Sequence, residues 1–527
     1  MGKKRKFIKI MGISTAIAVS QIRAVAAQEV PQTNDGRNTT EDIEEIIKPA
    51  QPAIPNTDNL NPSGNPLSFP TTPEEVEVDD GDRQSITLEQ ALELSLRNNK
   101  EIEQARLEVE RSQFELRQER AALYPNLDLD SSITYGNDLF LDSITEQRID
   151  DEVQDGIEDS PDVDEDALRD FTEDRFGSSG SASFDYSGSI GVTYNIFTGG
   201  RRGASIRSAE KQLRSEELDL ERIVEETRLE TANDYYELQN NDAQVEIQQA
   251  AVEDAQQTLR DAQLLERAGL GTRFDVLRAE VELAQAEQRL TTANANQSIA
   301  RRQLAETLSV SHSTQLTTAD AIEEAGAWEM GLPETIVMAF KNRAELEQFL
   351  LQREISQEQR TIALSATRPQ LSANAAYTTS DDFEDDFDIS DSYSVGLSLQ
   401  WRLFDGGAAR AAANQAETDE QIAETQFANQ RDEIRFAVEQ AFFQLESNLN
   451  NIATARRSVE LAEESLRLAR LRFQAGVGTQ TDVIEAQTSL TTERGNLLSS
   501  ITDYNQSLAS LNRQVSNTPD SGLQDLP

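Results

Sequence analysis

The chain has 527 residues, of which 48 are Lys or Arg and 95 are Asp or Glu, giving a formal net charge of −47. So acidic a chain argues against a nucleic-acid partner, because binding to a phosphate backbone needs a basic surface. Cysteine is absent, which excludes disulfides and thiolate metal sites. Hydrophobic residues make up 37% of the chain. That fraction suffices for seams between helices but not for one large globular core.

Residues 1–26 are typical of a secretory signal peptide. The basic segment MGKKRKFIKI leads into the short apolar segment IMGISTAIAVSQI, and an Ala-x-Ala cleavage motif follows at 24–26. This apolar segment is too short to span a membrane, and no later segment approaches about eighteen consecutive apolar residues. We therefore expect an exported protein without membrane-spanning helices.

Three further segments are expected to lie outside the folded repeats. Residues 27–84 are rich in Pro, Asn, Thr and acids, a composition that predicts a disordered linker. Residues 516–527 read as a loose tail. The acidic segment 137–183 is interpreted as a solvated loop. A calcium site is the alternative, but the segment lacks the glycine and spaced glutamate of an EF-hand loop.

The remainder of the chain is an internal duplication. LEQALELSLRNNKEIEQ at 88–104 matches LPETIVMAFKNRAELEQ at 332–348, and FTGGRRGA at 197–204 matches FDGGAARA at 404–411. Two tandem copies of one structural unit are therefore predicted. We place the first repeat at 85–310, a connecting segment at 311–331 and the second repeat at 332–515.

Each copy contains two segments in which apolar and polar residues alternate, which indicates β-strands. The expected strands span about 125–136, 184–197, 369–380 and 391–404. Such strands fit either an antiparallel sheet on a soluble core or a membrane barrel that is apolar outside and wet inside. Export, and the lack of any other apolar layer, favour the barrel. Because the smallest barrels have about eight strands, an oligomer must supply the rest.

Two long helices follow the strands in each copy. They are expected at about 200–267 and 273–310, and again at 407–474 and 480–514. An apolar or small residue recurs every seven positions in the first copy, and every three and four in the second, as in a coiled-coil seam. The positions are Val224, Thr231, Leu238, Val245, Val252 and Leu259, then Ile452, Ala455, Val459, Ala462, Leu466, Ala469 and Phe473. Helices of about 100 Å must pack against others of equal length.

These features together resemble the TolC-type outer-membrane efflux protein family, the outer membrane factors. The resemblance is carried by the signal peptide, the strand pairs ending in NIFTGGRRGA and RLFDGGAARA, and the turns AGLGTRFDVLRAE and AGVGTQTDVIEAQ. It extends over about 85–515. It implies a mainly α fold with a β-barrel membrane part, in which four strands per chain contribute to a homotrimeric barrel of about 12 strands. The helices would form a periplasmic α-barrel.

The resemblance also implies the function and its setting. Such a protein is an exit duct in the outer-membrane lipid, with a large periplasmic portion, and it is neither an enzyme nor dependent on a cofactor. It would dock through a periplasmic adaptor, or membrane fusion protein, onto an inner-membrane transporter of the RND or ABC type. Multidrug efflux and type I protein secretion are both open. The alternative function is a structural tether across the envelope without transport.

The two helix-to-helix turns are the expected adaptor contacts. Glycine permits the positive φ that reverses the chain, and a threonine can cap the outgoing helix. In this chain the positions are Gly269, Gly271, Thr272, Gly476, Gly478 and Thr479.

The second turn carries the expected periplasmic gate. Asp482 and Glu485 share one helix face and match the acids that ring the entrance in the family. Threefold symmetry would crowd six carboxylates, favour cations and raise their pKa values. The plainer interpretation of Asp482 is helix capping. The expected gate network also contains Asp275, Gln480, Arg273 and Arg278. Gln480 stands where the family has an arginine, so Arg273 or Arg278 is expected to replace its ion pair.

Overall fold

The computed structural model describes residues 50–57, 60, 67, 69–75, 83–136, 147, 149–154, 164–176, 183–311, 313–382 and 389–515. The expected signal peptide and C-terminal tail lie outside these residues. The helices are η2 (Pro73–Glu75), α1 (Leu88–Asn98), α2 (Lys100–Ala121), α4 (Glu165–Phe176), α5 (Arg201–Arg267), α6 (Arg273–Thr307), α7 (Leu332–Asn342), α8 (Ala344–Ser365), α9 (Ala408–Gln474) and α10 (Gln480–Val515). The strands are β1 (Arg83–Ile86), β2 (Asn126–Gly136), β3 (Ser183–Phe197), β4 (Gln315–Thr318), β5 (Gln370–Asp382) and β6 (Ser390–Gln400).

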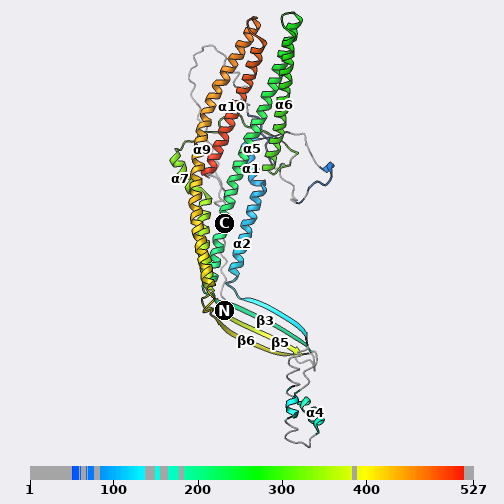
Figure 1. The fold of residues 1–527 in the computed structure, drawn as a ribbon, viewed down its shortest axis with the longest axis vertical. Helices are drawn as coiled ribbons and strands as arrows, with labels where there is room; N and C mark the ends of the chain where they lie inside the picture. The colour runs from blue at the N-terminus through cyan, green and yellow to red at the C-terminus, as the bar shows by residue number, and fades with distance from the viewer. Residues whose placement is uncertain are drawn as a thin grey trace, which may run out of the picture. The chain divides into compact units, whose positions relative to one another are not determined.

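Two helical hairpins dominate the fold, α5 with α6 and α9 with α10 (Figure 1). Helices α5 and α9 each contain 67 residues and so extend about 100 Å. Each begins directly after a glycine in the left-handed region, Gly200 with φ of 97° and Gly407 with φ of 91°. Glycine is required there because an L side chain rarely adopts this backbone conformation. The long helices expected from the sequence are confirmed.

The predicted seam positions lie on the packed faces of both long helices. In α5 the buried positions are Val224, Thr231, Leu238 and Val252, and in α9 they are Ile452, Ala455, Val459, Ala462 and Leu466. The α9 residues form one apolar cluster with residues of α10 that include Leu497, Ile501 and Leu511. Burial of one such large aliphatic side chain contributes about 1.5–3 kcal/mol, so the seam stabilises each hairpin internally.

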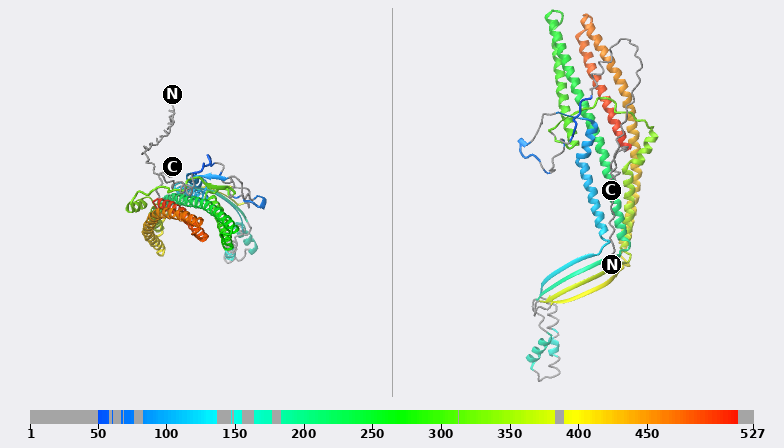
Figure 2. Two further views of the ribbon diagram at one scale, coloured as in Figure 1. Left: turned by 90° about the horizontal axis from the view of Figure 1, so that it is seen from above. Right: turned by 180° about the vertical axis from the view of Figure 1, so that it is seen from behind.

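Below the hairpins, α2, α5, α8 and α9 lie side by side in that order, in a curved layer (Figure 2). The order follows the duplication, because α2 and α8 occupy equivalent places in the two repeats, as do α5 and α9. The two outer helices of this layer carry large apolar side chains in solvent. They are Leu107 and Phe114 on α2, and Ile422, Phe436 and Phe443 on α9.

The four long strands form one antiparallel sheet in the order β2-β3-β5-β6. The register places Leu127 opposite Val192 and Tyr377 opposite Tyr393, so the apolar residues of neighbouring strands share one face. This face is open: Leu129, Tyr393 and Val395, for example, are 76%, 85% and 82% exposed. No described helix packs extensively over either side of the sheet. The sequence prediction of amphipathic strands is confirmed, and β2 and β6 remain as unpaired edges.

A second, parallel sheet was not anticipated from the sequence. Strand β1 pairs with β4, which lies in the segment expected to be a mere connection. Residues from the expected linker also pack here. The backbone N–H of Ile54 donates to Ser85 over 2.8 Å, that of Gln51 donates to Ala319 over 2.6 Å, and Leu60 is buried. The expectation of a disordered linker over 27–84 therefore does not hold at 51–57 and at Leu60, because Ile54 and Leu60 pack against the apolar cluster beside this sheet.

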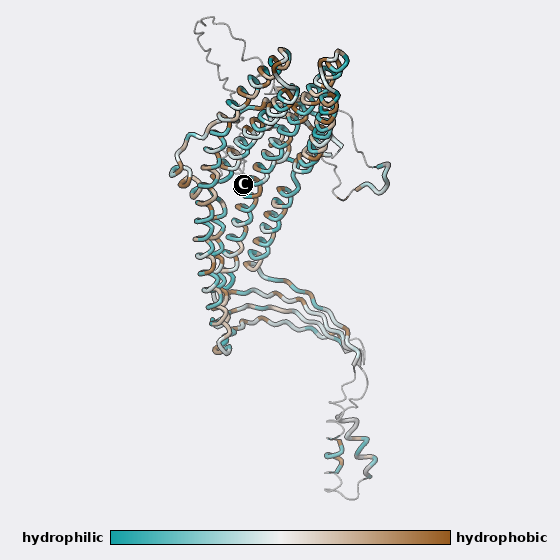
Figure 3. Tube along the Cα trace, turned by 45° about the horizontal axis from the view of Figure 1, so that its top comes forward, coloured by the Kyte–Doolittle hydropathy of each residue, from teal (hydrophilic) through white to brown (hydrophobic). Residues whose placement is uncertain are grey.

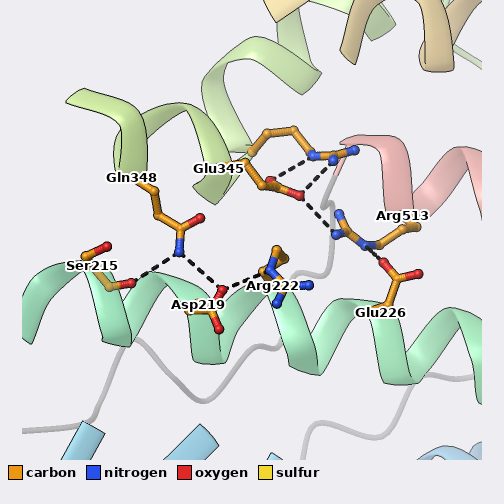
Figure 4. Close-up of polar contacts among 8 residues, drawn as sticks. Ser215, Asp219, Arg222, Glu226, Glu345, Gln348 and Arg513 are labelled. Atoms are coloured by element: carbon orange, nitrogen blue, oxygen red, sulfur yellow. Dashed lines mark hydrogen bonds and ion pairs between the residues drawn. The ribbon is translucent and has the colours of Figure 1, made fainter. Parts of the chain in front are cut away.

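A polar cluster fastens the end of α10 to α5 and α8 (Figure 4). Arg513, which is 6% exposed, donates to Glu226 of α5 over 3.2 Å and to Glu345 of α8 over 3.1 Å. Arg343 makes a second ion pair with Glu345 at 2.7 Å. Beside it, Gln348 of α8 donates to the Ser215 carbonyl of α5 over 3.2 Å. The C-terminal end of the second repeat is thus pinned to the first repeat.

Apolar and polar residues are interspersed along the helices and the four long strands (Figure 3). Among the described residues, no helix is both long enough and apolar enough to cross a membrane. In the segment 137–183, expected to be a loop, the described part includes helix α4, so the loop interpretation is corrected there. The described residues contain no cluster of three or more side chains placed to hold a metal ion.

Candidate functional site

The two hairpin turns have the same backbone structure. Gly269 and Gly476 adopt φ of 74° and 73°, two residues after the last residue of each incoming helix. The N–H groups of the next two residues then donate back to one carbonyl, that of Leu265 in the first turn and Arg472 in the second, over 2.9–3.1 Å. These bonds satisfy carbonyls that a helix end otherwise leaves unpaired.

The second glycine of each turn allows a close backbone approach. A Cβ atom added at Gly478 would lie 3.0 Å from the Arg472 Cβ and 3.0 Å from the Phe473 backbone nitrogen. At Gly271 the corresponding nearest contact would be 3.1 Å, to the Leu265 Cβ. Glycine is therefore favoured at these positions by the geometry of the turn itself, because any Cβ atom would push its neighbours aside by a few tenths of an ångström.

A reciprocal capping box starts each outgoing helix. The Thr272 N–H donates to the Asp275 carboxylate over 2.9 Å, and the Asp275 N–H donates to the Thr272 hydroxyl over 3.3 Å. Thr479 and Asp482 repeat this arrangement, at 2.9 Å and 3.2 Å. Hydrogen bonds from the Thr479 backbone and hydroxyl, with the charge of Arg472, lower the pKa of Asp482. Within one chain Asp482 is thus a helix cap whose carboxylate is ionised.

An ion pair between the two repeats joins the expected gate residues. Arg278 of α6 lies 3.9 Å from Glu485 of α10, with the two side chains 39% and 70% exposed. Arg273, by contrast, is exposed, and its guanidinium has no ion-pair partner among the described residues. Of the two arginines named from the sequence, the structure brings Arg278 to the acids and leaves Arg273 apart.

Gln480 lies away from this ion pair. It is 5% exposed, it faces a cavity between α5 and the second hairpin, and its Nε2 has no hydrogen-bond partner. The sequence placed Gln480 in the gate network as the substitute for an arginine. In the folded chain its side chain is instead enclosed between the hairpins. An amide N–H that is buried without a hydrogen-bond partner costs about 1–3 kcal/mol of folding free energy.

Sequence reasoning missed two further contacts between the hairpins. Arg470 of α9 forms an ion pair with Asp254 of α5 at 3.1 Å, and Thr258 donates to Gln487 over 3.3 Å. The partners in each pair are more than 200 positions apart. No local pattern in the sequence could have paired them.

The duplicated unit, the paired glycine turns and the four-stranded sheet that lacks a cover define a class of channel subunits with helical hairpins and a β part. The chain belongs to the outer membrane efflux protein family. The family profile matches residues 91–309 and 335–515, which together make up more than half of the chain.

Individual relatives are similar over part of their length. Outer membrane efflux protein BepC from Brucella suis is 30% identical over 192 residues, covering 35% of this chain and 40% of BepC. Alkaline protease secretion protein AprF from Pseudomonas aeruginosa is 28% identical, covering 31% of this chain and 35% of AprF. These alignments span less than half of either relative.

Solved structures are similar over nearly the whole fold. The outer membrane protein VceC from Vibrio cholerae has a TM-score of 0.66 at 17% identity, covering 82% of this chain and 97% of VceC. The CmeC outer membrane channel from Campylobacter jejuni has a TM-score of 0.66 at 14% identity, covering 86% and 94%. At such identities the likeness establishes the fold, and the fold class expected from the sequence is confirmed.

Proposed function

We propose that the protein is the outer-membrane exit duct of a tripartite efflux or type I secretion system. The observation that carries this proposal is the uncovered amphipathic sheet, whose apolar face lies in solvent in the single chain. Lipid is the medium that such a face fits, with the polar face turned toward a water-filled lumen. The role is passive conduction, without catalysis or a cofactor.

We propose that a homotrimer closes the duct. Strands β2 and β6 are edges with unpaired backbone groups, and an exposed edge of this kind demands a partner. Three copies of the four-stranded sheet would supply 12 strands. The same operation would bring α2 of one copy against α9 of the next. It would bury the exposed Leu107 and Phe114 against apolar side chains such as Phe436.

The tips of the hairpins form the proposed periplasmic gate. In a trimer Asp482 and Glu485 would contribute six carboxylates around the axis, and Arg278 would hold Glu485 from the neighbouring hairpin of its own chain. This exposed ion pair contributes at most about 1 kcal/mol per chain. We infer a gate that is weakly held and cation-selective. In the ring, the neighbouring carboxylates would raise the pKa of Asp482 and so oppose the lowering seen in the single chain.

The glycine turns are the proposed contacts for a periplasmic adaptor, with an inner-membrane transporter of the RND or ABC type behind it. BepC is named for efflux and AprF for secretion of a protease, so both kinds of cargo are proposed for this chain. The expected N-terminal signal peptide would direct export across the inner membrane, and the strands would then insert in the outer membrane with the hairpins in the periplasm. The strands' polar face distinguishes a duct from a closed structural tether.

Ion conductance tests the proposal. The purified protein, inserted in a planar bilayer, should form discrete cation-selective channels, and its cross-linked species should be a trimer. Asp482→Asn with Glu485→Gln should bring the potassium-to-chloride permeability ratio close to one. Asp432→Asn with Glu433→Gln on α9 removes equal charge away from the tips and should change the ratio less. A trimer without conductance would instead support the tether. Equal permeability ratios for the two double variants would show that the gate does not lie at the tips.

A further inference from the structure

The four crossings between helices and strands lie at one end of the β2-β3-β5-β6 sheet (Figure 1). With the first residues of α5 and α9, they comprise 122–125, 198–202, 366–369 and 401–410. In a chain with 95 acidic and 48 basic residues, these segments hold one carboxylate, Asp405, and five arginines: Arg201, Arg202, Arg368, Arg402 and Arg410. Asp405 itself accepts the backbone N–H groups of Gly407 and Ala409 at the start of α9. This end of the sheet is therefore locally basic.

The opposite end of the sheet has the reverse charge. The last three residues of each strand at that end include no arginine or lysine, and their acids are Asp185, Asp381, Asp382 and Asp391. The register even places Asp185 directly opposite Asp382. The strands contain 11 to 15 residues, enough to cross one hydrocarbon core. In the proposed membrane, the basic end and the acidic end would lie at opposite interfaces.

Three of the arginines are gathered at the two middle crossings, from β3 to α5 and from α8 to β5. Arg368 donates through Nη1 to the Gly199 carbonyl over 3.0 Å, two residues before Arg201. Arg202 donates through Nη1 to the Asn195 carbonyl over 2.7 Å. None of the three has an ion-pair partner among the described residues, and Arg201 and Arg368 are exposed. We call Arg201, Arg202 and Arg368 the arginine collar, whose positive charge no carboxylate offsets.

The apolar face of the sheet ends beside the arginine collar. Alternation along β6 places Trp401 after Leu397 and Leu399 on this face, and Trp401 is 57% exposed. Its indole N–H donates over 3.1 Å to the carbonyl of Thr367, the residue before Arg368. Tryptophan is enriched where hydrocarbon meets lipid headgroups, and arginine places its apolar stem in that zone with its charge in the polar layer. The junction has both features of a membrane interface.

A neighbouring copy would not cover the collar. In the proposed trimer the copies meet along the edge strands β2 and β6 and along α2 and α9. The collar belongs to the two middle strands and to α5 and α8, so its exposure does not depend on viewing one chain alone.

We propose that the arginine collar binds the phosphate groups of anionic phospholipids in the leaflet on the helical side of the membrane. This inference rests on the proposed function, because it takes the sheet to be inserted in lipid. A guanidinium offers several N–H donors in a planar fork that matches a phosphate. Basic side chains at an anionic leaflet each add to the attraction. The collar thereby fixes the depth of the sheet in the membrane.

Quenching of Trp401 fluorescence by brominated phospholipids tests the proposal, since bromine in the acyl chains quenches only a tryptophan that it contacts. The chain has two tryptophans, so Trp328→Phe leaves Trp401 as the reporter. This full-length protein is reconstituted in vesicles of phosphatidylcholine and phosphatidylglycerol, with one or the other lipid brominated. Phosphatidylglycerol should associate about three- to tenfold more strongly at about 0.1 M salt. The preference should fall below about twofold at about 1 M salt.

Two double variants in this background separate the collar from overall charge. Arg201→Gln with Arg368→Gln should lower the preference to below about twofold. Arg267→Gln with Arg273→Gln removes equal charge at the hairpin tip, about 100 Å away along α5, and should leave the preference unchanged. Arg201→Gln alone replaces the first double variant if that protein does not fold. If Trp328→Phe does not fold, the wild-type Trp328, which packs between helices, contributes a constant unquenched background.

The outcomes distinguish the collar from the proposed function. Quenching by both lipids with equal association constants would refute the collar and leave the inserted sheet intact. Equal preferences in the two double variants would also refute it. If neither brominated lipid quenches Trp401, the sheet does not lie in lipid, and the duct and the collar both fail.

Discussion

Glu345 accepts hydrogen bonds from Arg343 and Arg513, and its contribution to the free energy of unfolding follows from its pKa. Burial alone would raise its pKa, but the hydrogen bond and charge of Arg343, with the charge of Arg513, outweigh this and lower the pKa to about 2 from 4.5. The difference corresponds to about 3 kcal/mol of folding free energy. Glu345→Gln should therefore lower the free energy of unfolding by about that amount at neutral pH.

The pH dependence gives the sign of this effect. Because the folded-state pKa is depressed, the stabilisation is present above the ordinary value of 4.5 and is lost as pH falls toward about 2. Wild type and Glu345→Gln should therefore converge near pH 2. Denaturant unfolding followed by circular dichroism in detergent measures both quantities. The half-buried Trp328, which packs against two apolar clusters, offers a second, fluorescent signal.

Glu347→Gln is the matched control for this experiment. Glu347 lies on the same helix and pairs with Arg214 at 3.2 Å, but the two side chains are 51% and 49% exposed. Water screens this pair, so its loss should cost less than about 1 kcal/mol. The reasoning is refuted if Glu345→Gln costs no more than Glu347→Gln, or if its cost is the same at pH 7 and at pH 2.

Three further predictions concern the turn and the core. Gly476→Ala forces an L residue to φ of 73° with no steric contact, so thermal unfolding should show a loss of about 1–2 kcal/mol. Tyr235→Phe removes the hydroxyl that donates to Asp320 over 2.7 Å, and should cost about 1–3 kcal/mol by the same assay. Burial raises the pKa of Asp234, so its stabilisation is full below its ordinary value and is lost as pH rises. Asp234→Asn should therefore raise the melting temperature at pH 8 but not at pH 3, and an equal shift at both would contradict this.

Much of the fold followed from short-range patterns. The strands were predictable because alternation with a period of two requires only neighbouring residues, as in Leu127 to Tyr135. The seam of α5 and α9 was predictable for the same reason, with a longer period. The turns were predictable because a glycine at positive φ, followed by Thr and Asp three positions apart, forms a local unit. The parallel pairing of β1 with β4 was missed, since each strand has only four residues.

The candidate site was likewise predictable only where its contacts are local in sequence. The caps at Asp275 and Asp482 involve residues three positions apart, and the sequence anticipated them. It also proposed Arg273 and Arg278 as equal candidates to pair with the gate acids. Only the packing of α10 against α5, which sets the two hairpins side by side, decided for Arg278, which lies 3.9 Å from Glu485.

The sequence by itself thus determined the duplication, the amphipathic faces and the glycine turns, because each depends on periodicity or on contacts within one turn of chain. The tertiary structure alone decided what lies between the hairpins. Gln480 was expected at the gate, but its side chain is buried between the hairpins. Arg470 forms an ion pair with Asp254, which lies 216 positions away in the sequence. These outcomes depend on how two long helices of different repeats are set side by side. That setting is the sum of many weak contacts along the seams, and no single motif encodes it.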